Sequence, residues 1–173
     1  VFRQLARYGV GKPLESRYMN DVIKTIKSNH DCNDFTLNGL LRMAYIDRKQ
    51  PFMTGGFRDS VRNVVLDFKY WWDDGRRDTT YRCYHTENHQ ALYHTAELLA
   101  GQLYKSSMFS NGMTGKEHIS HAMNLIEPWL DNRLRFGFSE WLSTYYDVEA
   151  LLLANLVDYA EDREIRRKAR SVL

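Results

Sequence analysis

Hydrophobic residues recur every three or four positions along most of this chain, and no long stretch alternates apolar with polar residues. A period of three to four places apolar side chains on one face of an α-helix, whereas alternation would indicate a half-buried strand. The pattern therefore predicts an all-α protein of about seven helices. The expected helices cover residues 16–30, 35–47, 57–73, 86–104 and 145–160, with one starting at Thr114 and a last one from about Arg163.

Local signals mark several of the expected helix ends. Thr114 with Glu117 three residues later matches a capping box, so a helix should start there. The turn signal Asp73-Asp74-Gly75 should end the helix over 57–73. Pro128 lies inside the helix that begins at Thr114, and its missing N–H group should kink or split that helix.

The alternation of helices and loops resembles paired helical hairpins stacked in an arc or ring. The expected fold is therefore all-α, with helical hairpins in an (α/α) toroid-like or partial toroid arrangement. A length of 173 residues fits one domain. Because the chain begins at Val1 and stops inside a helical pattern, we expect residues 1–173 to be a single all-α domain from a longer protein. The long connections are 49–56, 74–85 and 105–114.

Charge and hydropathy exclude two classes of partner. The 24 basic residues are nearly balanced by 22 acidic ones, which is not the charge pattern of a nucleic-acid-binding protein. No apolar run approaches the roughly 18 residues that a membrane span needs. We therefore expect no nucleic acid and no membrane partner. Cys32 and Cys83 fit no paired-cysteine motif, and the sequence leaves their pairing open.

The densest polar cluster is His85-Thr86-Glu87-Asn88-His89-Gln90, which leads directly into a helical pattern. A helix start has unpaired N–H groups and favours negative charge. An amide, an imidazole and a carboxylate at such a position suit the recognition of a polar, charged ligand. The alternative is that Glu87 and Asn88 serve only the helix start itself.

The histidines do not form a recognisable metal motif. His85 and His89 are four apart and would share a helix face, and His118 and His121 form a second close pair. Glu87 is the third residue of His-Thr-Glu-Asn-His, so the metalloprotease pattern is not met. Zinc needs three or four converging ligands, which two distant pairs do not indicate. We expect no metal and no cofactor.

A second polar and aromatic cluster covers residues 133–149. Arginine binds carboxylates through two parallel hydrogen bonds, and aromatic rings offer apolar surface to a sugar. The candidate substrate-binding residues here are Arg133, Arg135, Trp141 and Tyr146. An aromatic hinge between two core helices is the alternative interpretation.

Together the two clusters suit a sugar that carries a carboxylate. Asn88 and His89 could hold a uronate carboxylate and ease removal of the C5 proton. Tyr145 or Tyr146 could take that proton and return it to the leaving oxygen. A tyrosine normally titrates near 10, so this one would need a nearby cation. The candidate catalytic residues are Glu87, Asn88, His89, Glu140 and Tyr145.

The sequence Glu87-Asn88-His89 ahead of a long helix, followed by Tyr145, resembles the (α/α) toroid polysaccharide lyases of the alginate lyase and heparinase II/III-like group. The resemblance covers roughly residues 57–160. It implies that Asn88 and His89 neutralise the carboxylate and that Tyr145 is the acid/base of an elimination. The partner would then be an acidic polysaccharide or another glycan, and the protein would be extracellular or periplasmic.

Two other functions remain open. A glycoside hydrolase of the six-hairpin kind would use two carboxylates across a groove, with Glu87 and either Glu140 or Glu149 as candidates. A non-catalytic helical binding module is the third possibility. Its sign would be that Glu87, Asn88 and His89 are all satisfied by the backbone.

Overall fold

The computed structural model describes residues 1–28, 30–76, 82–140 and 146–173, and within them every regular element is a helix. One isolated bridge pairs Met108 with Thr114. The all-α prediction is confirmed, and the ring-like arrangement stays a prediction. The helices are α1 (Phe2–Gly9), α2 (Ser16–Lys27), α3 (Asn33–Lys49), α4 (Gly55–Asp67), α5 (Glu87–Leu103), α6 (Gly115–Phe136), α7 (Tyr146–Tyr159) and α8 (Arg163–Val172).

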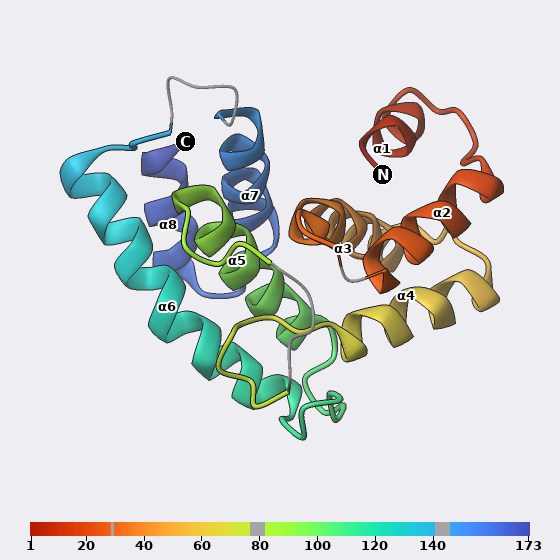
Figure 1. Ribbon diagram of the computed structural model, residues 1–173. Helices are drawn as coiled ribbons and strands as arrows, with labels where there is room; N and C mark the ends of the chain where they lie inside the picture. Colours follow the sequence, from red (N-terminus) through yellow and green to blue (C-terminus); the bar gives the residue numbers. More distant parts are fainter. Residues whose placement is uncertain (29, 77–81, 141–145) are drawn as a thin grey trace.

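Helix α5 runs through the middle of the molecule (Figure 1), between α6–α8 on one side and α1–α4 on the other. Tyr93 and Leu99 belong to the hydrophobic cluster shared with α2, α3 and α4. Leu92 and Leu98 belong to the cluster shared with α6, α7 and α8. Of the 17 residues in α5, 14 are buried, as expected for a helix covered on all sides. Its N-terminus, which carries the predicted site, is therefore held by both halves of the core.

Helix α4 ends at Asp67, so the prediction that it continues to residue 73 is wrong. Donors from outside the helix bind its last carbonyl groups, which a longer helix would have used internally. The Arg76 guanidinium donates to the carbonyls of Asp67 (2.8 Å) and Phe68 (2.9 Å). The Tyr70 hydroxyl donates to the carbonyl of Val65 at 2.8 Å. The aromatic residues after the helix thus enter the core from a non-helical segment.

Helix α6 begins at the predicted capping box, in which Thr114 and Glu117 bind each other's backbone N–H groups. The helix is continuous through Pro128, so the predicted split does not occur. Proline removes one backbone hydrogen bond, which burial of neighbouring side chains can offset. Ile126 and Leu130, on either side of Pro128, are fully buried in the second core cluster.

Helix α1 is an element that the sequence analysis did not predict. It has eight residues, of which Gln4 is buried. The Gln4 amide donates to Glu15 Oε2 at 3.2 Å and accepts from the Glu15 backbone N–H at 2.9 Å. A helix this short has too few apolar residues to set up a clear period, and side-chain hydrogen bonds join it to the start of α2.

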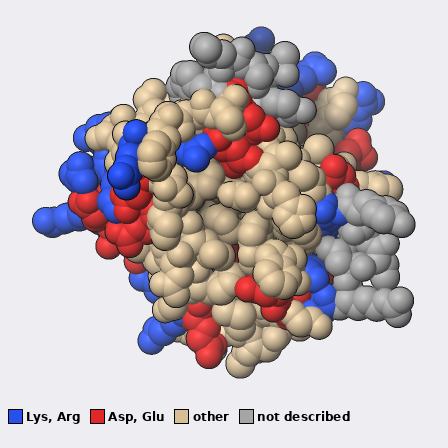
Figure 2. Space-filling model, turned by 60° about the vertical axis from the view of Figure 1, so that its left-hand side comes forward, with Lys and Arg blue, Asp and Glu red and all other residues tan. Residues whose placement is uncertain are grey.

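Charged side chains on the face shown in Figure 2 lie in groups of mixed sign around a broad uncharged area. Surface charges of opposite sign also form ion pairs, as between Arg42 and Asp158 (2.5 Å) and between Lys168 and Asp131 (2.6 Å). None of the helices in the described part of the chain combines the length and the apolar character needed to cross a membrane.

The histidine pair of α6 faces a buried carboxylate of α5. Glu97 Oε1 lies 2.7 Å from His118 Nδ1 and 2.9 Å from His121 Nδ1. His121 Nε2 lies 3.3 Å from an oxygen of Asp73. The hydrogen bond with Glu97, followed by the charges of Glu97 and Asp73, raises the pKa of His121 from 6.5 to about 9, against the effect of burial. The predicted pair thus joins two helices and the loop after α4.

We expect His121 to make stability depend on pH above neutrality. Its folded pKa is raised, so the stabilisation is complete below pH 6.5 and is lost as pH rises through about 9. The expected loss is about 1–2 kcal/mol, because the side chain is partly exposed. Urea unfolding on both sides of this window should show the loss in the wild type, and His121→Gln should lack it. If the free energies of unfolding of the two proteins change equally with pH, His121 is not the group responsible.

Candidate functional site

The first turn of α5 places Asn88 and His89 in the interior, 2% and 6% exposed. His89 Nδ1 lies 2.7 Å from Oδ2 of Asp34, a fully buried residue in the first turn of α3. Burial acts to lower the pKa of His89, but the hydrogen bond and the charge of Asp34 raise it overall. The carboxylate of Asp34 therefore fixes the orientation of the ring.

Two nitrogen atoms of this turn remain available to a ligand. The Thr86 hydroxyl donates to Asn88 Oδ1 at 2.6 Å. The Asn88 amide nitrogen, Nδ2, takes no part in this bond and can donate to a ligand. With His89 Nδ1 bound to Asp34, the second ring nitrogen is Nε2. Within residues 1–28, 30–76, 82–140 and 146–173, no hydrogen bond uses Asn88 Nδ2 or His89 Nε2.

Glu87 joins the start of α5 to the segment that follows α6. Its carboxylate pairs with Arg133 and accepts from the backbone N–H (3.0 Å) and hydroxyl (2.6 Å) of Ser139. Burial opposes ionisation, but the bonds from Ser139 and Arg133 lower the pKa of Glu87. One residue further, Glu140 Oε2 accepts the backbone N–H of Asn88 at 2.9 Å. Residues 139 and 140 therefore lie directly against the first turn of α5.

A third carboxyl group lies behind this contact. Glu149 in α7 is completely buried. Burial, followed by the negative charge of the nearby Glu87, raises the pKa of Glu149 from 4.5 to about 8. Glu140 adds to the shift and Arg133 opposes it. The three acids and one arginine form an acidic cluster, comprising Glu87, Arg133, Glu140 and Glu149, which carries a proton on Glu149 at neutral pH.

The remaining predicted residues have different surroundings. Arg135 is exposed, and its guanidinium carbon lies 5.0 Å from the centre of the Phe136 ring. Tyr146 begins α7 and is 56% exposed. Trp141 and Tyr145 lie outside the described residues. The predicted residues that the structure brings together are Glu87, Asn88, His89, Arg133, Glu140 and the alternative acid Glu149.

The start of α3 supplies groups that the sequence analysis missed. Asp31, Cys32 and His89 each offer one metal-ligand atom, and these atoms lie within 4.8 Å of one another. The Cys83 backbone N–H donates to Asp31 Oδ1 at 3.0 Å, which holds the loop before α5 against the loop before α3. The expectation of no metal site rested on the histidine pairs alone. The available signal was Asp31-Cys32-Asn33-Asp34, a polar cluster at a helix start like the one before α5.

The two cysteines are free thiols with different surroundings. Burial and the neighbouring charge of Asp31 raise the pKa of the Cys32 thiol. Burial also acts to raise the pKa of Cys83, but the backbone N–H groups of His85 and Thr86 lower it overall. The sequence could not relate the two positions. In the fold they lie on adjoining loops, one before α3 and one before α5.

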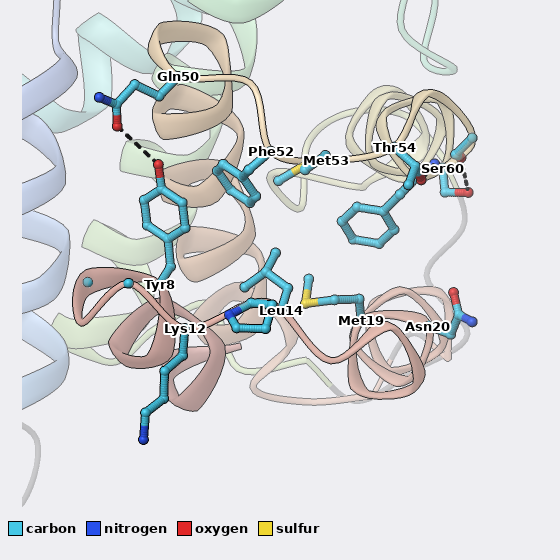
Figure 3. Close-up of a pocket in the computed structure, with 15 residues that line it drawn as sticks. Tyr8, Lys12, Leu14, Met19, Asn20, Gln50, Phe52, Met53, Thr54 and Ser60 are labelled. Atoms are coloured by element: carbon cyan, nitrogen blue, oxygen red, sulfur yellow. Dashed lines mark hydrogen bonds between the residues drawn. The ribbon is translucent and has the colours of Figure 1, made fainter.

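A separate cavity of about 1040 Å³ lies between α1, α2 and the segment joining α3 to α4. Its wall is largely apolar: Figure 3 shows Leu14, Met19 and Phe52 pointing towards one another, with the Tyr8 hydroxyl donating to Gln50 Oε1 at 3.1 Å. The predicted long connection 49–56 supplies one side of this cavity. None of the residues around it belongs to the first turn of α5.

Comparison of the chain with protein-family models, with curated protein sequences and with solved structures finds no match. Function is therefore inferred from the side chains gathered at the starts of α3 and α5.

Proposed function

We propose that this chain carries the catalytic residues of a polysaccharide lyase that acts on uronic-acid-containing glycans. The single observation that supports the proposal most is a pair of nitrogens on one helical turn, Asn88 Nδ2 and His89 Nε2, that no hydrogen bond among the described residues uses. This turn lies next to the segment that leads to Tyr145. Asp34 supports it as well, because its carboxylate holds the His89 ring and favours a positive charge on it.

The proposed reaction is an elimination. A uronate carboxylate next to C5 must lose much of its negative charge before the C5 proton can be removed, and paired nitrogen donors in a buried position supply that stabilisation. Asn88 and His89 would bind the carboxylate oxygens. A tyrosine side chain would then take the C5 proton and protonate the leaving glycosidic oxygen, giving an unsaturated uronate at the new non-reducing end.

The place of residues 139 and 140 supports Tyr145 as the choice for this base. The bonds from Ser139 to Glu87 and from Asn88 to Glu140 bring the chain to the first turn of α5 just before residue 141. Tyr145 is five residues beyond Glu140, and α7 begins at Tyr146. Tyr145 is the proposed base, and Tyr146 is its natural comparison because it is the same residue type one position away.

The test is absorbance of the unsaturated product during incubation with a panel of uronic-acid polysaccharides. Asn88→Ala should lower the rate by about 100-fold or more, and Tyr145→Phe by about 100- to 10000-fold, the ranges for an electrostatic donor and a general acid/base. Tyr146→Phe distinguishes the two tyrosines, because a larger loss in Tyr146→Phe than in Tyr145→Phe would move the role of the base to Tyr146. If no substrate gives a rise with the folded wild type, the lyase proposal is wrong.

The acidic cluster favours a glycoside hydrolase as the second candidate. Glu87 and Glu140, one of the two carboxylate pairs predicted for hydrolysis, both lie at the first turn of α5. New reducing ends without an unsaturated product, lost in Glu140→Gln, would support this candidate. If neither assay detects a product, a non-catalytic binding module is the remaining interpretation.

A further inference from the structure

The loops before α3 and α5 meet at a group of metal-ligand atoms. Asp31 offers a carboxylate oxygen, Cys32 a thiolate sulfur and His89 an imidazole nitrogen, all within 4.8 Å of one another. Atoms that ligate a common ion at about 2 Å must lie within roughly 4 Å of each other, so the group needs only small side-chain adjustments to hold an ion. From these positions we propose that Asp31, Cys32 and His89 bind a zinc-type transition metal ion.

The surroundings of His89 support the proposal independently. Histidines that ligate a metal through one ring nitrogen almost always donate the other N–H to a carboxylate or carbonyl group. His89 Nδ1 lies 2.7 Å from the fully buried Asp34, which leaves Nε2 for the ion. A buried aspartate bound to one nitrogen of a histidine, with a thiol and a second carboxylate near the same ring, is an arrangement that such sites use.

Backbone conformation and a backbone hydrogen bond fix the positions of Cys32 and Asp31, the other two proposed ligands. Cys32 has φ 64°, and within the described residues no other non-glycine residue has a positive φ. Such a conformation costs on the order of 1–3 kcal/mol and has to be held by its surroundings. The Cys83 N–H fixes Asp31 through Oδ1 at 3.0 Å, which leaves Oδ2 for the ion.

The ligand types select the class of metal. A thiolate and an imidazole favour zinc and similar ions over calcium or magnesium, which prefer oxygen ligands alone. Three protein ligands leave a fourth tetrahedral position for water or a substrate oxygen. The Asp31 and Cys32 side chains are exposed, so an ion and a ligand can both reach the site from solvent.

The test is titration of the reduced 173-residue chain with Co²⁺, which replaces zinc and gives a charge-transfer band when a thiolate binds it. We expect one Co²⁺ per chain and such a band. Cys32→Ser should remove the band and weaken binding by at least about 100-fold. Asp34→Asn should keep the band and weaken binding by about 10- to 100-fold, the usual effect of losing the outer partner of a ligating histidine.

Cys83→Ser is the matched control, because Cys83 is the second thiol, lies on the adjoining loop and is not in the proposed ligand set. It should keep both the band and the affinity. A band that persists in Cys32→Ser or disappears in Cys83→Ser would overturn the assignment, as would a folded wild type that binds no Co²⁺. Since Cys32 is exposed, its substitution should not prevent folding. No substrate enters the measurement, so its outcome is separate from that of the lyase assay.

Discussion

Substituting Gly115 with alanine should destabilise this protein by about 3 kcal/mol, at the upper end of the range for overpacking a core. A Cβ at this position would lie 2.7 Å from the Cα of Lys105 and still closer to the carbonyl oxygen of Tyr104. Both obstacles are backbone atoms, so a side-chain rotation cannot make room. The end of α5 and the start of α6 would have to move apart. Thermal unfolding should show a midpoint lower by roughly 6–12 °C for a chain of this length.

Gly56→Ala is the matched control. Gly56 is also near the start of a helix, α4, but a Cβ there meets no atom within 4 Å. Alanine at such an open helical position reduces the entropy of the unfolded chain, so this variant should gain about 0.4–1 kcal/mol. Opposite signs for the two substitutions are expected. Equal effects would mean that the close approach of α5 and α6 does not constrain Gly115.

The close approach at Gly115 also shows why only part of the fold was predictable. The apolar period and the Thr114 capping box are local properties, and they located most of the helices correctly. The end of α4 depends on Arg76 and Tyr70, whose side chains bind its last carbonyl groups from outside the helix. No local signal contains those contacts. The turn signal at residues 73–75 was consequently mistaken for the end of the helix.

The candidate site also has a part that local sequence signals predict and a part that depends on the packing of distant segments. The polar cluster 85–90 was predicted to lie at a helix start, which is confirmed, whereas the match of residues 133–140 to a charged sugar stays a prediction. The contribution of α3 was not predictable, because Asp34 and His89 are 55 positions apart in the chain and only the packing of α3 on α5 brings them together. Asp34 nevertheless decides the chemistry of the site, since it occupies one nitrogen of His89.

The two proposals for His89 are related through that nitrogen. With Nδ1 bound to Asp34, either a proton or a metal ion on Nε2 would put positive charge at the first turn of α5. Nε2 cannot carry both at once, so with the ion bound the metal, and not the imidazole, would meet the carboxylate of a sugar. The Co²⁺ titration and the lyase assay therefore measure different properties of one position, and each can fail without the other.

Substituting Glu149 with glutamine should stabilise the protein, with a gain that grows as pH rises. The folded pKa of Glu149 is about 8 and the ordinary value is 4.5. Below pH 4.5 the carboxyl group is protonated in both the folded and the unfolded state, and it costs nothing. Between pH 4.5 and about 8 only the unfolded state ionises, so the wild type loses stability throughout this window. Glutamine has nearly the same shape as glutamic acid and cannot ionise, so it avoids this loss.

The expected gain is on the order of 3 kcal/mol at neutral pH, since each pKa unit corresponds to about 1.4 kcal/mol. Denaturant unfolding of the two proteins should coincide in acid and diverge towards pH 8. Asp147→Asn is the matched control, because Asp147 is an exposed acid in the first turn of the same helix and its substitution should give no such divergence. Glu149 is buried behind Glu87 and not on the surface. A gain in the free energy of unfolding in Glu149→Gln would therefore show that the acidic cluster lowers the stability of the wild type. A proton held at such a cost is typical of a functional site, whereas a wild type as stable as Glu149→Gln throughout would indicate an ordinary core contact.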